Sequence, residues 1–150
     1  MPTQIDYEYD HSLYGVEHES GPFDVTREIV DVYTRSIGDD NPIFTDAEAA
    51  RAAGYADQVA PPTLCALFER GELPDIKLQF GRRQFHGGQR VEPRAPIVVG
   101  DRLTASSHLK DVYTKTGRSG TMVHVVWETT FSNQDGVVVA DVQRSQVVRE

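Results

Sequence analysis

Nine residues in the first third of the chain combine side chains that could transfer a proton. Residues 38–46 read GDDNPIFTD and hold three carboxylates and one amide. Asp39 could act as a general acid or base, and Asn41 could bond a ligand or the turn backbone. Pro42 has no N–H and disfavours helix in the residue before it, so the chain must turn here and present these polar groups. An ordinary polar turn also accounts for such a cluster. The sequence therefore predicts a candidate site at Asp39 and leaves a purely structural role open.

Two later positions could complement a carboxylate at this turn. Thr63 follows two prolines at the expected start of a helix, where unpaired N–H groups such as that of Leu64 could polarise a carbonyl oxygen. His86 precedes two glycines, which permit close approach of the backbone, and an imidazole can exchange a proton near neutral pH. A lone histidine is more often structural, and we expect Cys65, inside an apolar segment, to be an inert buried thiol.

The elements that must position these residues change from helices to strands along the chain. The first half predicts a short strand and three helices, at 23–25, 26–37, 47–53 and 63–69. The second half predicts strands at 89–94, 102–114, 121–131 and 137–148, with hairpin turns at 116–120 and 133–136. The helix at 63–69 is apolar on nearly all sides, so it should be buried. We therefore expect a single α+β domain in which an antiparallel sheet wraps around this apolar helix.

Composition narrows the class of protein. The chain has 150 residues, enough for one domain with a sizeable core, and we expect a flexible tail over 1–12 and the domain over 13–150. The net charge of -8 disfavours nucleic acid and anionic membranes as partners. A single cysteine, no metal-ligand spacing, no secretory signal and no membrane-length apolar run lead us to expect a cytoplasmic protein without a metal. The candidate basic patch for an anionic coenzyme is Arg82, Arg83, Arg90 and Arg94.

Several motifs in sequence order resemble the MaoC-like hydratase/dehydratase family. They are GDxNPxxxD at 38–46, AARAAGY at 49–55, VAPPT at 59–63 and RAPIVVGDRL at 94–103, and the likeness extends from Leu13 to the C-terminus. It is greatest to the histidine-lacking branch, which is similar to FAS1-type and N-terminal dehydratase domains. The resemblance implies a hot-dog fold that acts on acyl thioesters. Coenzyme A or acyl carrier protein would form part of the substrate, with no other cofactor.

The sequence departs from this family at two positions. Active members use an Asp and a His five residues apart to hold the water that adds to, or leaves from, a 2-enoyl thioester. Asp39 matches the Asp, but Phe44 stands at the position of the His and cannot transfer a proton. Pro62 aligns with a glycine whose N–H binds the thioester carbonyl, so the N–H of a following residue would have to substitute. By resemblance, the substrate-binding residues are Asn41, Phe44, Pro62, Thr63 and Leu64.

These departures favour a subunit that depends on a partner. The preferred interpretation is the histidine-lacking subunit of a heteromeric enoyl-CoA hydratase or 3-hydroxyacyl thioester dehydratase. It would bind the acyl thioester and shape the tunnel, while a histidine-bearing hot-dog subunit supplies catalysis. The alternatives are a self-sufficient homodimeric hydratase that uses Asp39 with His86, a non-catalytic acyl-CoA-binding homodimer and, less favoured, an acyl-thioester hydrolase.

Overall fold

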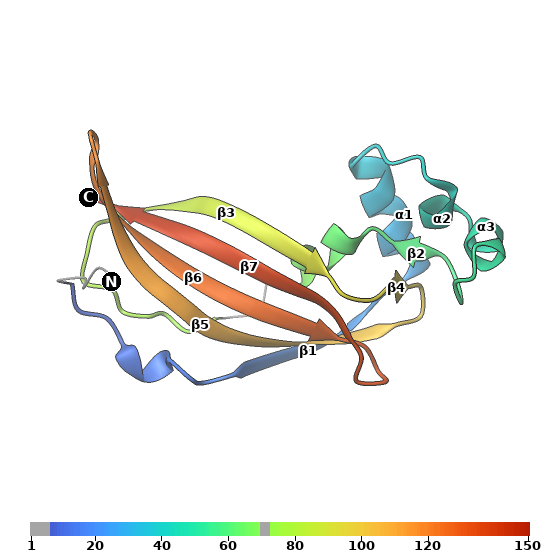
Figure 1. Cartoon of the computed structure of the whole chain (residues 1–150), viewed down its shortest axis with the longest axis horizontal. Helices are drawn as coiled ribbons and strands as arrows, with labels where there is room; N and C mark the ends of the chain where they lie inside the picture. The colour runs from blue at the N-terminus through green and yellow to red at the C-terminus, as the bar shows by residue number, and fades with distance from the viewer. Residues whose placement is uncertain (1–6, 70–72) are drawn as a thin grey trace.

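A computed structural model describes residues 7–69 and 73–150, and its largest element is a five-stranded antiparallel sheet. The elements in chain order are η1 (His11–Leu13), β1 (His18–Asp24), α1 (Arg27–Ser36), α2 (Pro42–Thr45), α3 (Ala47–Ala52), β2 (Val59–Ala60), η2 (Pro62–Glu69), β3 (Arg83–Pro93), β4 (Ile97–Val98), β5 (Arg102–Gly117), β6 (Gly120–Ser132) and β7 (Val138–Arg149). The helices α1, α2 and α3 gather beyond one end of the sheet, and the C-terminus lies at the other end (Figure 1). None of the helices in the described ranges has the length and apolar character needed to cross a membrane.

The sheet has the strand order β1-β5-β6-β7-β3, so β1 and β3 are its edges. Alternation along β6 buries Val123, Val125, Trp127 and Phe131 on one face, as predicted. Strand β3 begins at Arg83, six residues before the predicted start. The first half of β3 was missed because it lies at the edge of the sheet and most of its side chains are exposed. Such a strand has no alternation of apolar and polar residues, which is the pattern that predicts a strand.

Local signals located α1, α3 and η2, but not the single turn α2 inside the predicted polar turn. Thr26 caps α1 by accepting a hydrogen bond from the Ile29 N–H at 3.2 Å, and the chain leaves the helix at Gly38, where φ is +70°. The predicted buried helix at 63–69 is present as η2, but it is a 3-10 helix. Its side chains Leu64 and Cys65 are fully buried, as predicted, but Leu67 is 43% exposed, so the segment is not buried on all sides.

Two hydrophobic clusters cover the inner face of the sheet. At the helix end, Leu64 and Cys65 of η2 pack with Leu103, Phe131 and other residues of the long strands. At the opposite end the short helix η1 places Leu13 against a second cluster. Residues 73–82, which we call the strap, cross the sheet there without regular secondary structure, and Ile76 and Phe80 of the strap join this second cluster. The sheet thus encloses a short helix and a strap in succession.

Residues before β1 also contact this second cluster. Tyr7 and Tyr9 pack partly buried against it, and Tyr7 lies 4.3 Å from Phe80 between ring centroids. Residues 1–6, which belong to the expected tail, lie outside the described residues. The domain boundary at 12/13 therefore stays a prediction.

Candidate functional site

The turn between α1 and α2 holds Asp39 half-buried. Its Oδ1 accepts a hydrogen bond from the Asn41 N–H at 3.0 Å, and Asn41 Oδ1 accepts one from the Ile43 N–H at 3.3 Å, which caps α2. Asn41 therefore serves the turn backbone, one of the two roles left open by its sequence. Only Oδ1 of Asp39 is bonded within the described part of the chain, so the second carboxylate oxygen can accept from a ligand.

A buried amide that sequence reasoning missed holds this turn against its neighbours. Gln58 is 2% exposed, and its Nε2 donates to the Phe44 carbonyl at 2.7 Å and to Asp31 Oδ1 at 2.6 Å. Its Oε1 accepts from Arg27 Nη1 at 2.9 Å. Both N–H groups and the oxygen of the amide are thus used. No spacing marks Gln58 in the sequence, because a single polar residue before an apolar run looks like ordinary loop.

Asp57 extends this network to the surface. Its carboxylate bonds Arg27 at 3.1 Å and Arg51 at 3.5 Å. The Gln58 backbone N–H, at 2.7 Å, and then the Arg27 guanidinium hold the pKa of Asp57 below its ordinary value, so this carboxylate is charged at neutral pH. The segment that carries Asp39 and Phe44 is therefore tied to α1, to α3 and to the start of β2.

The start of η2 provides one candidate donor for a carbonyl oxygen. Pro62 has no N–H, and the Leu64 N–H donates to the Pro61 carbonyl at 2.9 Å. The Thr63 side chain bonds the Tyr33 hydroxyl, which joins η2 to α1, whereas no described residue accepts from the Thr63 N–H. Of the two substitutes that the sequence offered, Thr63 and Leu64, only Thr63 retains an available N–H.

His86 lies away from this turn. It is exposed near the start of β3, at the end of the sheet opposite the helices (Figure 1). The other four histidines contact β-sheet or N-terminal groups: His11 stacks on Tyr9, His124 stacks on Tyr113, His18 meets Trp127 edge-on, and His108 lies between Glu17 and Glu128. Within one chain, therefore, no imidazole of the described residues accompanies Asp39, and the structure does not bring Asp39 and His86 together.

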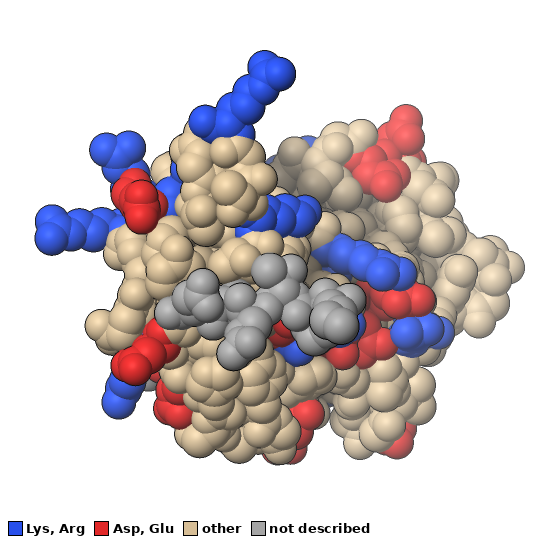
Figure 2. All heavy atoms as spheres, turned by 60° about the vertical axis from the view of Figure 1, so that its left-hand side comes forward, with Lys and Arg blue, Asp and Glu red and all other residues tan. Residues whose placement is uncertain are grey.

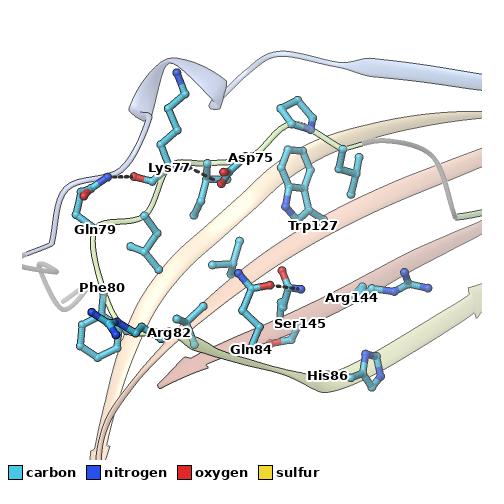
Figure 3. Close-up of a pocket in the computed structure, with 18 of the residues that line it drawn as sticks. Asp75, Lys77, Gln79, Phe80, Arg82, Gln84, His86, Trp127, Arg144 and Ser145 are labelled. Carbon is cyan, nitrogen blue, oxygen red and sulfur yellow. Dashed lines mark hydrogen bonds between the residues drawn. The ribbon is translucent and has the colours of Figure 1, made fainter. Parts of the chain in front are cut away.

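A cavity of about 890 Å³ lies between the strap and the sheet, and His86 lines it. Figure 3 shows Phe80 and Arg82 at one end of this cavity and His86 and Arg144 at the other. Trp127 contributes an apolar wall from β6. None of Asn41, Phe44, Pro62, Thr63 and Leu64 lines the cavity, whereas the candidate base His86 and Arg82 of the predicted basic patch both do.

The predicted basic patch is divided in two. Arg90 and Arg94 both pair with Glu92, at 3.7 and 3.3 Å, and Arg94 also pairs with Asp141. Arg82 and Arg83 form no ion pair with a described carboxylate, and they lie at the end of the sheet that also carries Lys115, Arg118 and Arg149. Figure 2, turned toward that end, shows basic side chains projecting from the upper left of the face in view. In the described residues no group of His, Cys, Asp and Glu is arranged to hold a metal ion.

Comparisons with solved structures define the class of fold. The chain is similar to a hot-dog subunit of the HadBC (3R-hydroxyacyl-ACP dehydratase) complex of Mycobacterium tuberculosis, with a TM-score of 0.73 and 24% identity over 92% of this chain and 98% of that one. It is also similar to the ChsH1-ChsH2 complex of the same organism, with a TM-score of 0.70, 21% identity and coverage of 88% and 89%. The chain is an α+β hot-dog domain, as the sequence predicted.

Sequence comparisons assign the family. The model for the FAS1-like, dehydratase domain region matches residues 12–142. A UPF0336 protein of Parafrankia sp. is 40% identical over 75% of this chain and 78% of its own length, and one of Streptomyces avermitilis is 35% identical over 72% and 76%. The chain belongs to the MaoC-like dehydratase family and matches the FAS1-like dehydratase domains of that family.

Proposed function

We propose that this chain is the acyl-thioester-binding subunit of a heteromeric enoyl-CoA hydratase or 3-hydroxyacyl thioester dehydratase. The observation that carries the proposal is the absence of an imidazole beside Asp39 among the described residues, with Phe44 at the position where the family has its histidine. Hydration needs a group that takes a proton from water near neutral pH, and histidine is suited to this. A second hot-dog subunit would supply it. HadBC and ChsH1-ChsH2, which share the fold, are themselves complexes.

The β3 edge offers a route to such a shared site. An unpaired edge strand is a template for a strand of another chain. If two hot-dog subunits paired these edges antiparallel, the start of β3 would lie beside the helix end of the partner. The cavity under the strap is lined by Gln84 and His86 near the start of β3. It would then lie beside the partner's catalytic residues and could hold the acyl group on which they act. The carrier of the acyl group would be coenzyme A or acyl carrier protein.

The same geometry favours one second candidate, a homodimeric hydratase. His86 lies on the β3 edge strand, so pairing of two copies would bring His86 of one chain toward the helix end of the other. In that case Asp39 of one copy and His86 of a second copy would form the acid/base pair. This candidate needs no other gene product and therefore makes a different prediction for the purified chain.

The test measures loss of enoyl-thioester absorbance with a 2-enoyl-CoA and the purified chain alone. We expect no hydration by the chain alone, and turnover only with a histidine-bearing hot-dog partner, lost when that histidine is removed. Phe44→His should not give full activity either, because Pro62 offers no N–H at the donor position of the family and the Thr63 N–H lies one residue further along the chain. Loss of one such donor costs about 10²–10³ in rate; Phe44→Leu is the matched control. Robust turnover by the chain alone that disappears in His86→Ala would establish the homodimer instead.

A further inference from the structure

Three cations share one row across the sheet, at the end opposite the helices. Arg83 of β3 lies opposite Arg149 of β7. The same row continues through Met122 of β6 to Lys115 of β5. Neighbouring strands are about 4.8 Å apart, so the row spans about 14 Å over four strands. We call Arg83, Lys115 and Arg149 the basic row.

The basic row faces away from the cavity. Side chains alternate between the two faces of a strand, and Gln84 and Val148, which line the cavity, are on the inner face. Arg83 and Arg149 are next to these residues in sequence, so they are on the outer face, and Lys115 shares it because it belongs to the same row. Figure 2 shows basic side chains that project from this end of the molecule.

No carboxylate of the described residues neutralises the basic row. None of its three members forms an ion pair with one. The Arg149 guanidinium donates to the Ser119 carbonyl at 3.1 Å, which leaves its charge uncompensated. In the register of the outer face, the first carboxylate is Asp111, two rows away from Lys115. Arg83 and Arg149 are directly opposite each other, an arrangement of like charges that lowers the stability of a sheet. Charges that cost the fold stability in this way fit an anionic partner.

A second row on the outer face, directly beside the basic row, is aromatic and apolar. This apolar row runs over β5, β6, β7 and β3 and consists of Tyr113, His124, Val147 and Phe85. Tyr113 and His124 stack at 4.8 Å between ring centroids, and Phe85 is 49% exposed. A free phosphate group needs cations alone, whereas a protein surface also offers apolar side chains. Exposed apolar side chains next to cations therefore indicate a protein partner.

We propose that the basic row and the apolar row dock an acidic protein, and that this protein is an acidic acyl carrier protein that brings the acyl group. The chain as a whole has a net charge of -8, so the basic row is a local exception that would orient an acidic partner. Arg82 lines the cavity and directly precedes Arg83 of the basic row, so a carrier docked here would lie beside the cavity. The choice of carrier rests on the proposed function, whereas the docking of an acidic protein rests on the outer face alone.

The test measures binding without catalysis. We would titrate the full chain with a purified bacterial acyl carrier protein, in its apo and holo forms, and with free coenzyme A, by isothermal titration calorimetry. Both forms of the carrier protein should bind alike, because its surface and not its arm is recognised. Their affinity should fall about tenfold or more when NaCl is raised from about 0.05 to about 0.5 M. No binding of the carrier protein would overturn the proposal. Coenzyme A that binds and displaces the carrier protein would assign the cations to phosphate groups and would overturn it too.

The variant Arg83→Glu separates docking from folding. It removes a like-charge pair and places a carboxylate opposite Arg149, so the melting temperature should not fall. Its affinity for the carrier protein should nevertheless fall about tenfold or more, because a repulsive charge enters the docking surface. Lys115→Glu should weaken binding similarly, and Phe85→Ser should weaken it without changing its dependence on salt. Unchanged affinity in Phe85→Ser would show that charge alone attracts the carrier protein and that no protein surface is recognised.

The matched control is Arg35→Glu, which changes the net charge equally. Arg35 is exposed in the last turn of α1, at the helix end, and forms no ion pair with a described carboxylate. Its replacement should change carrier affinity by less than about twofold, because salt screens charges beyond a Debye length of about 10 Å. If Arg35→Glu weakens binding as much as Arg83→Glu, net charge attracts the carrier protein and the basic row is not its docking site.

Docking and the proposed function can fail separately. If the carrier protein docks but no hot-dog partner gives turnover of a 2-enoyl thioester, the proposed function fails and the docking surface stands. If a partner gives turnover of a 2-enoyl-CoA but the carrier protein does not dock, the proposed function stands and this inference is overturned.

Discussion

At the scale of single residues, Asp39 has a structural task that is independent of catalysis. Its Oδ1 bonds the Asn41 N–H, and Asn41 then caps α2. An Asp that organises a turn in this way persists whether or not it transfers protons. Phe44 also has a structural contact, because its backbone carbonyl accepts a hydrogen bond from Gln58. Its phenyl side chain cannot take part in acid/base chemistry. Both residues fit a site whose reactive base lies on another chain.

The substitution Asp39→Asn distinguishes the two tasks. The introduced amide would keep a side-chain oxygen that can accept from the Asn41 N–H, so the turn should survive. In a complex with a catalytic partner, we expect Asp39→Asn to change hydratase turnover only slightly, because the partner carries the chemistry. A loss of about 10²-fold or more, with an unchanged circular dichroism spectrum, would show that Asp39 is itself a general acid or base.

At the scale of elements, one amide joins three segments that are distant in sequence. Gln58 precedes β2, and it bonds Arg27 and Asp31 of α1 and the Phe44 carbonyl of α2. The helices at this end share few apolar residues with the sheet, and α2 has a single turn. Their arrangement therefore depends on buried polar contacts, which cost free energy when one partner is removed.

Replacement of Gln58 by Leu should destabilise the chain markedly. Leucine keeps roughly the volume but leaves the Phe44 carbonyl and Asp31 without their buried donor, and each such loss costs about 1–3 kcal/mol. We expect a decrease of about 2–4 kcal/mol in the free energy of unfolding, measured by urea denaturation. The matched control is Gln89→Leu on the exposed edge strand β3, which should change stability by less than about 0.5 kcal/mol. Equal effects of the two substitutions would contradict a stabilising role for the Gln58 network.

At the scale of the whole molecule, the two ends of the sheet differ. The helix end carries the candidate acid/base turn, and the other end carries the strap (Figure 1) and the cavity. Basic side chains project from that other end (Figure 2), and Arg82, Arg83, Lys115, Arg118 and Arg149 form no ion pair with a described carboxylate. Strand β3 runs between them as an exposed edge of 11 residues. A long edge strand of this kind is usually paired or covered in a native protein.

We therefore expect no stable monomer. Multi-angle light scattering at micromolar concentration should give at least twice the 16.7 kDa mass of one chain, either for the chain alone or after co-expression with a hot-dog partner. Mixing the two subunits should shift the mass to that of a hetero-oligomer if the proposed function is correct. A mass of one chain under all of these conditions would show that the β3 edge is not an interface.

The sequence by itself determined the features that depend on residues close together in the chain. Thr26 and Gly38 delimit α1 through local hydrogen bonding and backbone preference, and the alternation of β6 follows from the two faces of a strand. The turn formers around Asp39 predicted the location of the candidate turn, and the change from helices to strands predicted an α+β domain. The hot-dog fold was predicted by the resemblance of several motifs, in sequence order, to the MaoC-like family.

Only the tertiary structure decided which of the candidate residues lie together. His86 and Asp39 are compatible in type, but the course of β3 places them at opposite ends of the sheet (Figure 1). Gln58 becomes a buried junction because α1, α2 and β2 converge on it, and Arg144 and Trp127 share a cavity because β6 and β7 pair in one register. These outcomes depend on contacts between distant segments, whose free energy comes from burial and register over the whole sheet and leaves no local pattern in the chain.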